Sequence, residues 1–402
     1  MSFVQNVVKR IPVVNSLFKG KKTQPAWPVA AHDIRDPSWS SEGVSVEESG
    51  PQGGGKQAIL VKRPDGAIND ETFAFKDAPV PDLLPEDQGK SVVMQTILIS
   101  LDPTHRLWVG NEDVYMPRVG LNNVMRSLNL GRVTKSNSSK FPVGTYAIGV
   151  GGVQEYAVLP EGALTPVTTG IPLSSNLSVF NGLIGLTSWV GVNICNPKEG
   201  ETMVVSGAYG AVGSIAAQLG KARGARVIGV AGGTEKCTWL LEQAGCDAVI
   251  DYKSENVGDA LKKLAPDGVD CFFDNTGGPI LSEVMLQANN YARIAICGII
   301  STYNDQGHAS LPSYERVLIK RMTVQGFVCF DHIGDLPDAM AELIALYKEG
   351  KLKYNEHIEE CQITDYVRVV NYLFSGKNTG KLMMKIAEYE DSAAASKEDE
   401  QK

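Results

Sequence analysis

The pattern of apolar and polar residues changes along the chain and marks two folded regions. Between residues 57 and 165, short runs alternate apolar and polar residues and are separated by Gly and Pro, which predicts a mainly antiparallel β domain. Between residues 200 and 330, strand-like runs instead alternate with helix-like segments, which predicts a parallel sheet with helices on both faces. The strand-like runs are Met203–Ser206, Arg226–Val230, Ala248–Ile250, Val269–Asp274, Arg293–Gly298 and Met322–Phe327.

Beyond residue 350 the strand pattern returns. Tyr354–Glu359 and Lys381–Ile386 are expected to be strands on either side of a helix at Asp365–Phe374. The expected fold is therefore α/β, a doubly wound parallel sheet inserted in a mainly antiparallel β domain. The predicted domains are 57–185 with 351–388 for the β part and 186–350 for the inserted part.

The two ends of the chain differ from this body. Residues 1–56 form a basic extension that ends in a glycine-rich linker over 41–56, and folding is expected to start near Gln57. The apolar stripe of the extension fits an organelle-targeting peptide, a membrane-surface helix or a solvated tail. Residues 389–402 are acidic and lack large apolar side chains from Asp391 onward, so this end is predicted to be a disordered acidic tail.

Composition excludes several classes of protein. The net charge is -8, so a general attraction to nucleic acid is not expected. The chain has no run of about 18 apolar residues, so no integral membrane segment is predicted. The seven cysteines are odd in number and form no C-x-x-C pair, which favours a reducing compartment such as the cytoplasm. The five histidines are dispersed, and neither a G-H-E triplet nor a four-cysteine lobe is present, so no metal site is predicted.

A glycine-rich turn carries the strongest chemical signal. A predicted strand ends at Ser206 and a helix opens near Ala211, with Ala208, Gly210 and Gly213 in the three positions of a G-x-G-x-x-G pattern. Gly210 lets the backbone approach a pyrophosphate, and Gly213 lets the helix pack closely on the sheet. The strand before and the helix after it favour a dinucleotide cradle over an ordinary tight turn.

The second strand of this region bears on the choice of nucleotide. Sites for NAD place Asp or Glu at its end, whereas Ala231 and Gly232 stand there in this chain. Because no carboxylate stands at this position, a 2′-phosphate would not be repelled there. Lys236 on the following turn can attract that phosphate. These features favour NADPH as the cofactor, with a solvated helix lysine as the alternative reading of Lys236.

These motifs resemble the zinc-independent medium-chain reductases, and most closely the family of leukotriene 12-hydroxydehydrogenase, prostaglandin reductase and alkenal double-bond reductase. The resemblance covers about residues 57–388 and rests on Gly210–Gly213, Phe273–Gly278 and above all Arg293–Asn304. Shorter matches are Ser100–Pro103, Gly185–Thr187 and Asn378–Lys381. It implies a GroES-like substrate domain around a Rossmann NADP-binding domain, and it is the sole reason to expect a homodimer.

The resemblance also implies roles for individual residues. Tyr303 would be the catalytic phenol, and it follows the C-terminal end of a predicted parallel strand, where such sheets bind ligands; a surface loop tyrosine is the alternative. Lys236 and Tyr252 would hold the 2′-phosphate. The remaining cofactor-binding positions would be Ala208, Gly210, Ala211, Val212, Gly213, Asn275, Cys297, Gly298, Ser301, Phe327, Val328, Cys329 and Asn378.

The sequence departs from the family pattern in the substrate domain. Thr104-His105-Arg106 replaces Tyr-Met-Arg, Val153 replaces a Trp, and Cys361-Gln362 replaces a Gly-Leu pair. His105 is either a polar group of the substrate pocket or a structural or surface histidine. These departures lie in the predicted substrate domain and outside the predicted cofactor-binding positions.

The resulting hypothesis is an NADPH-dependent reductase of the C=C bond of α,β-unsaturated aldehydes or ketones. A small-molecule enone or enal is the expected partner, in the cytoplasm or, if the basic N-terminus is a targeting peptide, in an organelle. The alternatives are a quinone reductase of the same superfamily and a weakly catalytic, membrane-associated protein that binds NADP.

Overall fold

A computed structural model describes residues 47–48, 53–112, 114–305, 310–311 and 313–389 of the chain. These residues form two compact units, and the boundaries fall at 177/178 and 357/358, several residues from the predicted ones. The first unit includes 53–177, 358–375 and 382–389. The second includes 178–357, and the short segment 376–381 also belongs to it. Most of the predicted N-terminal extension and residues 390–402 of the predicted acidic tail lie outside the described residues.

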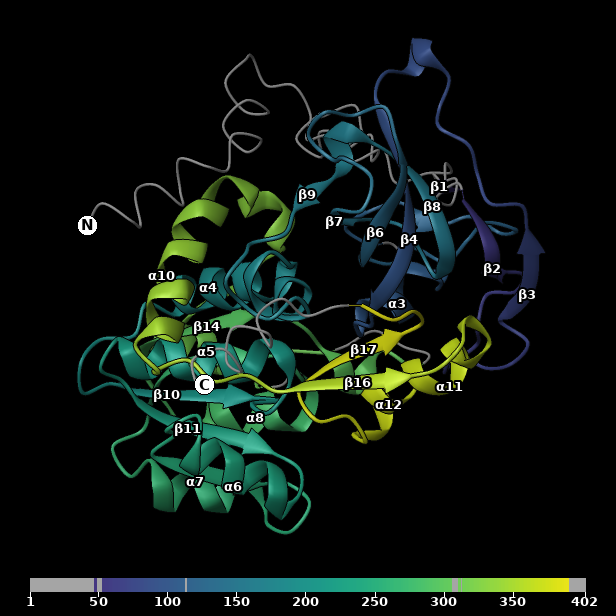
Figure 1. The fold of residues 1–402 in the computed structure, drawn as a ribbon. Coiled ribbons are helices and arrows are strands. Elements are labelled where there is room, and N and C mark those ends of the chain that lie inside the picture. The colour runs from purple at the N-terminus through teal and green to yellow at the C-terminus, as the bar shows by residue number, and fades with distance from the viewer. Residues whose placement is uncertain (1–46, 49–52, 113, 306–309, 312, 390–402) are drawn as a thin grey trace, which may run out of the picture. The chain divides into compact units, whose positions relative to one another are not determined.

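The first unit is built on a mainly antiparallel sheet, as predicted (Figure 1). Its strands run in the order β3-β2-β8-β4-β6-β7-β9, and the late strand β17 adds to β4 through the pair Met383 and Ser100. The bounds are β2 Gly53–Leu60, β3 Phe73–Ala78, β4 Ser91–Ser100, β6 Asn129–Ser136, β7 Tyr146–Gly149, β8 Gln154–Pro160, β9 Thr165–Pro166, β16 Glu356–Glu360 and β17 Lys381–Lys385. A short parallel pair, β1 (Glu47–Glu48) and β5 (Arg118–Val119), lies apart from this sheet.

The prediction that the linker extends to Lys56 is wrong, because β2 begins at Gly53. Gly53 and Gly54 of this strand pack closely against neighbouring backbone. A Cβ on Gly53 would lie 1.9 Å from the Tyr156 carbonyl oxygen, and one on Gly54 would lie 1.7 Å from that of Pro79. Gly55 has a φ of +70°, at an irregularity in the pairing of β2 with β8. These positions therefore require glycine within a strand.

The predicted helix at 365–374 is also interrupted. The structure has α11 (Tyr366–Val370) and α12 (Tyr372–Ser375), separated at Asn371. The Asn371 side-chain amide donates to the carbonyl oxygens of Val367 and Ile68, both at 2.8 Å. A side chain that bonds to nearby backbone in this way competes with the regular helix pattern.

The second unit contains a six-stranded parallel sheet in the order β12-β11-β10-β13-β14-β15 (Figure 1). The chain fills one half of the sheet from β10 outward, then returns to the middle and fills the other half, which is the Rossmann arrangement. The strands are β10 Thr202–Ser206, β11 Arg226–Ala231, β12 Ala248–Asp251, β13 Val269–Asp274, β14 Ala288–Ile296 and β15 Thr323–Gly326. The helices between β10 and β14 are α5 Ala211–Ala222, α6 Thr234–Glu242, α7 Val257–Leu264 and α8 Gly278–Gln287.

Central strands of this sheet are buried on both faces. Val204 pairs in register with Ile228 on one side and with Phe272 on the other, and all three are at most 1% exposed. Such continuous apolar runs are typical of parallel strands covered by helices on both faces. Because the strands are parallel, their carboxyl ends lie at one edge of the sheet. The glycine-rich turn after β10 lies at this edge.

Helix α4 (Leu183–Cys195) adds to the core of this unit. With the short helical segment before it, it makes Asn176–Cys195 the one stretch among the described residues that is long and apolar enough to span a membrane. Within this stretch, 61% of the most apolar 18-residue window is buried. Leu186 and Val190 of α4 pack against Cys329 and Ala339. Core helices of globular domains pass the same test of length and composition.

Candidate cofactor and active site

The residues predicted to bind the cofactor come together at the carboxyl edge of the parallel sheet in the second unit. Each group follows the end of a different strand: the cradle follows β10, Tyr252 follows β12, Asn275 follows β13, and Cys297 and Gly298 follow β14. Phe327, Val328 and Cys329 follow β15, and Ser301 and Tyr303 lie in the loop beyond β14. Open α/β sheets bind their ligands at this edge.

The glycine-rich turn has the geometry of a phosphate cradle. Gly207 adopts a φ of +55°, and Gly210 is the extended residue from which α5 begins. A Cβ on Gly213 would lie 2.3 Å from the Gly207 carbonyl oxygen, so this position accepts no side chain. The first N–H groups of a helix have no acceptor within the helix, so those of Ala211, Val212 and Gly213 suit an anion.

Tyr209 within this turn was not among the predicted residues. The residue is 7% exposed, and its ring meets the Trp239 ring edge-on, with 5.4 Å between centroids. The Lys236 Nζ lies 5.5 Å from the centre of the same ring. Tyr209 therefore links the cradle to α6, a contact across 30 residues that no local sequence pattern reveals.

No Asp or Glu stands at the end of β11, as predicted, but the Asp251 carboxylate at the end of β12 lies at the turn that follows. Ala231 is buried at the end of β11, and the backbone N–H of Gly233 donates to the Asp251 carboxylate at 2.9 Å. The Tyr252 ring lies so close to the Gly232 backbone that a Cβ on Gly232 would be 2.8 Å from it. The Lys236 ammonium is half-buried, and desolvation lowers its pKa. Tyr252 and Lys236 thus flank the turn where a 2′-phosphate is expected.

A buried carboxylate organises the loop after β13. Asp274 is fully buried, and its Oδ1 accepts hydrogen bonds from the Ser206 hydroxyl at 2.8 Å and from the backbone N–H groups of Thr276 and Gly277 at 2.9 and 3.0 Å. Burial raises its pKa. The Asn275 side chain, in turn, donates to the Ser206 carbonyl oxygen at 2.7 Å. Asp274 lies in the Phe273–Gly278 motif, so its position in the sequence was a usable signal.

The phenol of Tyr303 is held by its own loop. Its oxygen accepts the backbone N–H of Ile299 at 3.3 Å, and a Cβ on Gly298 would lie 3.2 Å from it. Burial raises the pKa of Tyr303 to about 12, so the phenol is protonated at neutral pH. Burial also raises the pKa of the neighbouring Cys297 thiol, which keeps that sulfur protonated. Tyr303 is thus a neutral hydrogen-bond donor at the carboxyl edge of the sheet.

The remaining predicted positions lie after β15 and in 376–381. The Phe327 ring packs edge-on against Phe273, with 6.2 Å between centroids, beside Gly191 of α4. Cys329 is buried, and Val328 is partly exposed. Asn378 lies in the second unit, although the prediction placed it in the returning part of the substrate domain.

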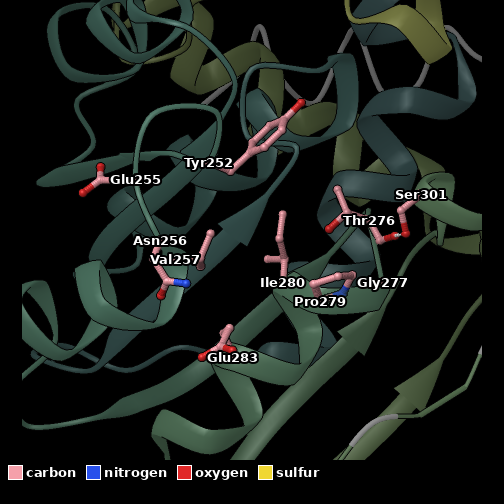
Figure 2. A pocket seen from close by; sticks show the side chains of 10 residues that line it. All are labelled: Tyr252, Glu255, Asn256, Val257, Thr276, Gly277, Pro279, Ile280, Glu283 and Ser301. Carbon is pink, nitrogen blue, oxygen red and sulfur yellow. Dashed lines mark hydrogen bonds between the residues drawn. The ribbon is translucent and has the colours of Figure 1, made fainter.

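A pocket of about 370 Å³ opens between α7 and α8 at the same edge (Figure 2). Tyr252 and Ser301 are predicted site residues that line it, and the Ser301 hydroxyl donates to the Thr276 carbonyl oxygen at 2.6 Å. The other lining residues were not predicted as site residues, although Thr276 and Gly277 belong to the Phe273–Gly278 motif; the rest lie at helix starts and in loops without a distinctive motif. These other lining residues are Glu255, Asn256, Val257, Thr276, Gly277, Pro279, Ile280 and Glu283.

The first unit contains the residues that depart from the family pattern, and the structure shows what surrounds three of them. His105 is fully buried; its Nδ1 lies 3.1 Å from the Tyr366 hydroxyl, and its ring packs on Trp108 with 5.2 Å between centroids. The surface alternative for His105 is therefore wrong. Val153 is also fully buried, whereas Thr104 makes a hydrogen bond with the exposed Tyr115 hydroxyl.

The described residues include candidate metal ligands and thiols in both units. Within them, no three His, Cys, Asp or Glu side chains are grouped so as to hold a metal ion. All seven cysteines are free, and five of them are buried.

Two family models match the chain. The first, described as the N-terminal domain of oxidoreductase, covers residues 56–167, and the second, described as zinc-binding dehydrogenase, covers residues 211–347. Together they span most of both units.

Individual proteins agree with this assignment. The chain is 37% identical to a putative NADP-dependent oxidoreductase, YfmJ, of Bacillus subtilis, over 83% of this chain and 98% of the relative. It is 34% identical to the NADPH-dependent curcumin reductase of Escherichia coli, over 82% and 96%. The crystal structure of CurA from Vibrio vulnificus in complex with NADPH matches with a TM-score of 0.77 and 33% identity, over 83% of this chain and all of that one. Together with its similarity to prostaglandin and 2-alkenal reductases, this shows that the chain belongs to the zinc-independent, NADPH-dependent family of medium-chain oxidoreductases.

Proposed function

We propose that this protein reduces the C=C bond of α,β-unsaturated aldehydes or ketones with NADPH. The observation that carries the proposal is the Tyr303 phenol, whose oxygen is positioned by the Ile299 N–H at 3.3 Å and whose pKa is raised to about 12. A neutral donor fixed at the carboxyl edge of a Rossmann sheet suits the stabilisation of charge on a substrate carbonyl oxygen. Similarity to curcumin, prostaglandin and 2-alkenal reductases supports the same substrate class.

The residues at this edge fit the cofactor. The Gly207–Gly213 turn leaves no room for a Cβ at Gly213 and presents the first N–H groups of α5, which suits a pyrophosphate. Lys236 and Tyr252 beside Gly232 and Gly233 suit the 2′-phosphate. The pocket of about 370 Å³ between α7 and α8 has the size and the partly apolar lining to take the adenosine end.

The other proposed contacts lie toward the nicotinamide end. Asn275 and the loop that starts at Cys297 and Gly298 would hold the nicotinamide riboside, with Ser301 nearer the adenosine end. Phe327, Val328, Cys329 and Asn378 would complete this part of the site. Asp274 would act through Asn275 and Thr276, because it fixes the backbone of the loop that carries them.

The chemistry divides between cofactor and protein. Bound NADPH supplies a hydride for the β-carbon of the substrate. Tyr303 donates its O–H to the carbonyl oxygen, on which negative charge develops as the β-carbon is reduced. One such donor lowers the barrier by about 3 kcal/mol. The Tyr303 phenol would also pass its proton to the α-carbon, and water would then reprotonate the phenolate, because the phenol is the stable form at neutral pH.

The direct test is the loss of reduced-nicotinamide absorbance with a short 2-alkenal, a straight-chain enone and a quinone in parallel, with NADH as control. Turnover of the alkenal and the enone with NADPH supports the proposal. Turnover of the quinone alone would replace it with a quinone reductase. Tight NADPH binding without turnover would favour a narrow unknown substrate or a protein that binds NADP with little catalysis. Liposome binding with and without residues 1–40 tests association with a membrane.

We also propose that the enzyme acts in the cytoplasm, which its seven free thiols favour. Fractionation of cells that express the tagged full chain tests this location, and an organellar signal would point to targeting by the basic N-terminus. A mass measurement in solution tests the homodimer.

A further inference from the structure

The short segment 376–381, which we call the strap, belongs to the second unit although the chain on either side of it belongs to the first. The chain belongs to the first unit up to Ser375 and again from Leu382, while Gly376–Lys381 belongs to the second. Gly376 and Gly380 adopt φ values of +68° and +73°. A Cβ on Gly380 would lie 2.2 Å from the Asn355 carbonyl oxygen, so the strap fits closely on its support. The strap carries Asn378, which is one of the proposed cofactor contacts.

Lys236 is the side chain that clasps the strap. Its ammonium donates to the carbonyl oxygen of Gly376 at 2.8 Å and to that of Asn378 at 3.0 Å. Hydrogen bonds from a charged donor are stronger than those between neutral groups. Two bonds of this kind therefore set the backbone position on both sides of Lys377.

A second path joins the strap to the cradle. The backbone N–H of Lys381 donates to the Asn355 carbonyl oxygen at 2.9 Å, and the Asn355 side-chain amide lies 3.0 Å from the Tyr209 hydroxyl. Tyr209 belongs to the cradle turn, and the Lys236 ammonium lies over its ring. Both anchors of the strap thus meet at residues that border the proposed phosphate sites.

The donor count of Lys236 allows it to hold strap and phosphate together. An ammonium group has three N–H donors, and the two strap carbonyls use two of them. The third can donate to a 2′-phosphate oxygen without release of the strap. A phosphate oxygen bound to the third N–H also restrains the ammonium beside the two carbonyls, which keeps its bonds to the strap in place.

We infer that Lys236 is a positioning residue for the strap as well as a phosphate ligand, so that binding of the 2′-phosphate tightens the strap and sets Asn378 for hydride transfer. The inference rests on the proposed use of NADPH. It differs from a phosphate-binding role alone, because it assigns Lys236 an effect that is present even without a 2′-phosphate.

Amide hydrogen exchange of the full chain tests the clasp without turnover. In the cofactor-free protein, Lys236→Met is expected to speed exchange at Thr379 and Lys381 by about tenfold. In the wild type, saturating NADPH is expected to slow strap exchange more than saturating NADH does, and Lys236→Met abolishes this difference. Equal protection by the two cofactors, or an unchanged strap in the variant, would overturn the inference.

Kinetics with NADH, which lacks the 2′-phosphate, separate the two roles of Lys236. A phosphate ligand alone predicts no change with NADH in Lys236→Met. The clasp predicts that kcat with NADH falls by about tenfold while KM for NADH stays within about twofold, and that Lys236→Arg restores part of kcat. Unchanged kcat with NADH would refute the positioning role.

Lys253→Met is the matched control. Lys253 is exposed and acts on Lys236 through charge alone, so this variant removes the same charge without touching the strap. Strap exchange should stay as in the wild type, and an equal loosening would refute the clasp. A protein whose strap behaves as expected but that reduces no enone would retain the clasp and lose only the proposed reaction.

Discussion

The Tyr303 hydroxyl accepts the backbone N–H of Ile299 at 3.3 Å, four residues earlier in the same loop. The bond uses a lone pair of the phenol oxygen and leaves the O–H proton to be donated. Because burial raises the pKa of Tyr303 to about 12, that proton is retained throughout the neutral range. The loop after β14 therefore presents a donor whose position is set by backbone.

Replacement of Tyr303 by Phe removes this donor together with the acceptor of the Ile299 N–H. We expect kcat for enone reduction to fall by about 100-fold, while the Kd for NADPH changes by less than about twofold. Steady-state kinetics and a fluorescence titration of NADPH measure the two quantities. Unchanged kcat, or a loss of NADPH binding that matches the loss of activity, would remove Tyr303 from the catalytic role.

The cradle predicts a sharp difference between two glycines. In Gly213→Ala the new Cβ would meet the Gly207 carbonyl oxygen at 2.3 Å, so the turn or the start of α5 must move. We expect the free energy of unfolding to fall by about 1–3 kcal/mol and NADPH affinity to fall by about tenfold. Gly334→Ala is the control, since its Cβ would meet nothing within 4 Å. Urea unfolding and NADPH titration compare the two, and equal behaviour would contradict the close packing of the cradle.

The buried carboxyl of Asp274 predicts a pH dependence of stability. Burial raises its pKa above that of the unfolded chain, so the folded state prefers the protonated acid. The stability that this preference contributes is complete below the unfolded value of about 3.9 and is lost as pH rises through the folded pKa. Asp274→Asn has no such titration and should gain stability relative to the wild type as pH increases from 4 toward 7.

Urea unfolding of both proteins at several pH values measures this difference. Asp259→Asn, at an exposed carboxylate of α7, is the control and should show a much smaller trend. A stability difference between Asp274→Asn and the wild type that does not change with pH would contradict a raised pKa.

The buried pair of His105 and Tyr366 predicts a loss of stability without a loss of chemistry. Tyr366→Phe removes the hydroxyl that lies 3.1 Å from the His105 Nδ1, and both side chains are fully buried. We expect the free energy of unfolding to fall by about 1–2 kcal/mol, with kcat per folded molecule unchanged. Tyr115→Phe, at an exposed ring, should cost less than about 0.5 kcal/mol. A large fall in kcat for Tyr366→Phe would instead place His105 in the substrate pocket.

Much of the second unit was predictable because its signals are local. A strand, a glycine-rich turn and a helix follow one another within Thr202–Ala222, and the helix begins at Ala211, where it was predicted to open. The glycines at 53–55 show the limit of such reasoning. A glycine run looks the same in a flexible linker and in a strand packed against backbone, and only the neighbouring Pro79 and Tyr156 distinguish the two.

The sequence by itself determined the division into an antiparallel β domain and a parallel α/β domain. It also determined the cradle, the absence of Asp or Glu at the end of β11, and the family. These follow from short-range periodicity, turn chemistry and motif spacing, which are written in adjacent residues. Only the tertiary structure decided which distant groups meet: His105 with Tyr366, Tyr209 with Lys236, and Lys236 with the strap about 140 residues later. Such contacts depend on how buried surfaces pack and how each polar group finds a partner, and chain order alone does not specify either.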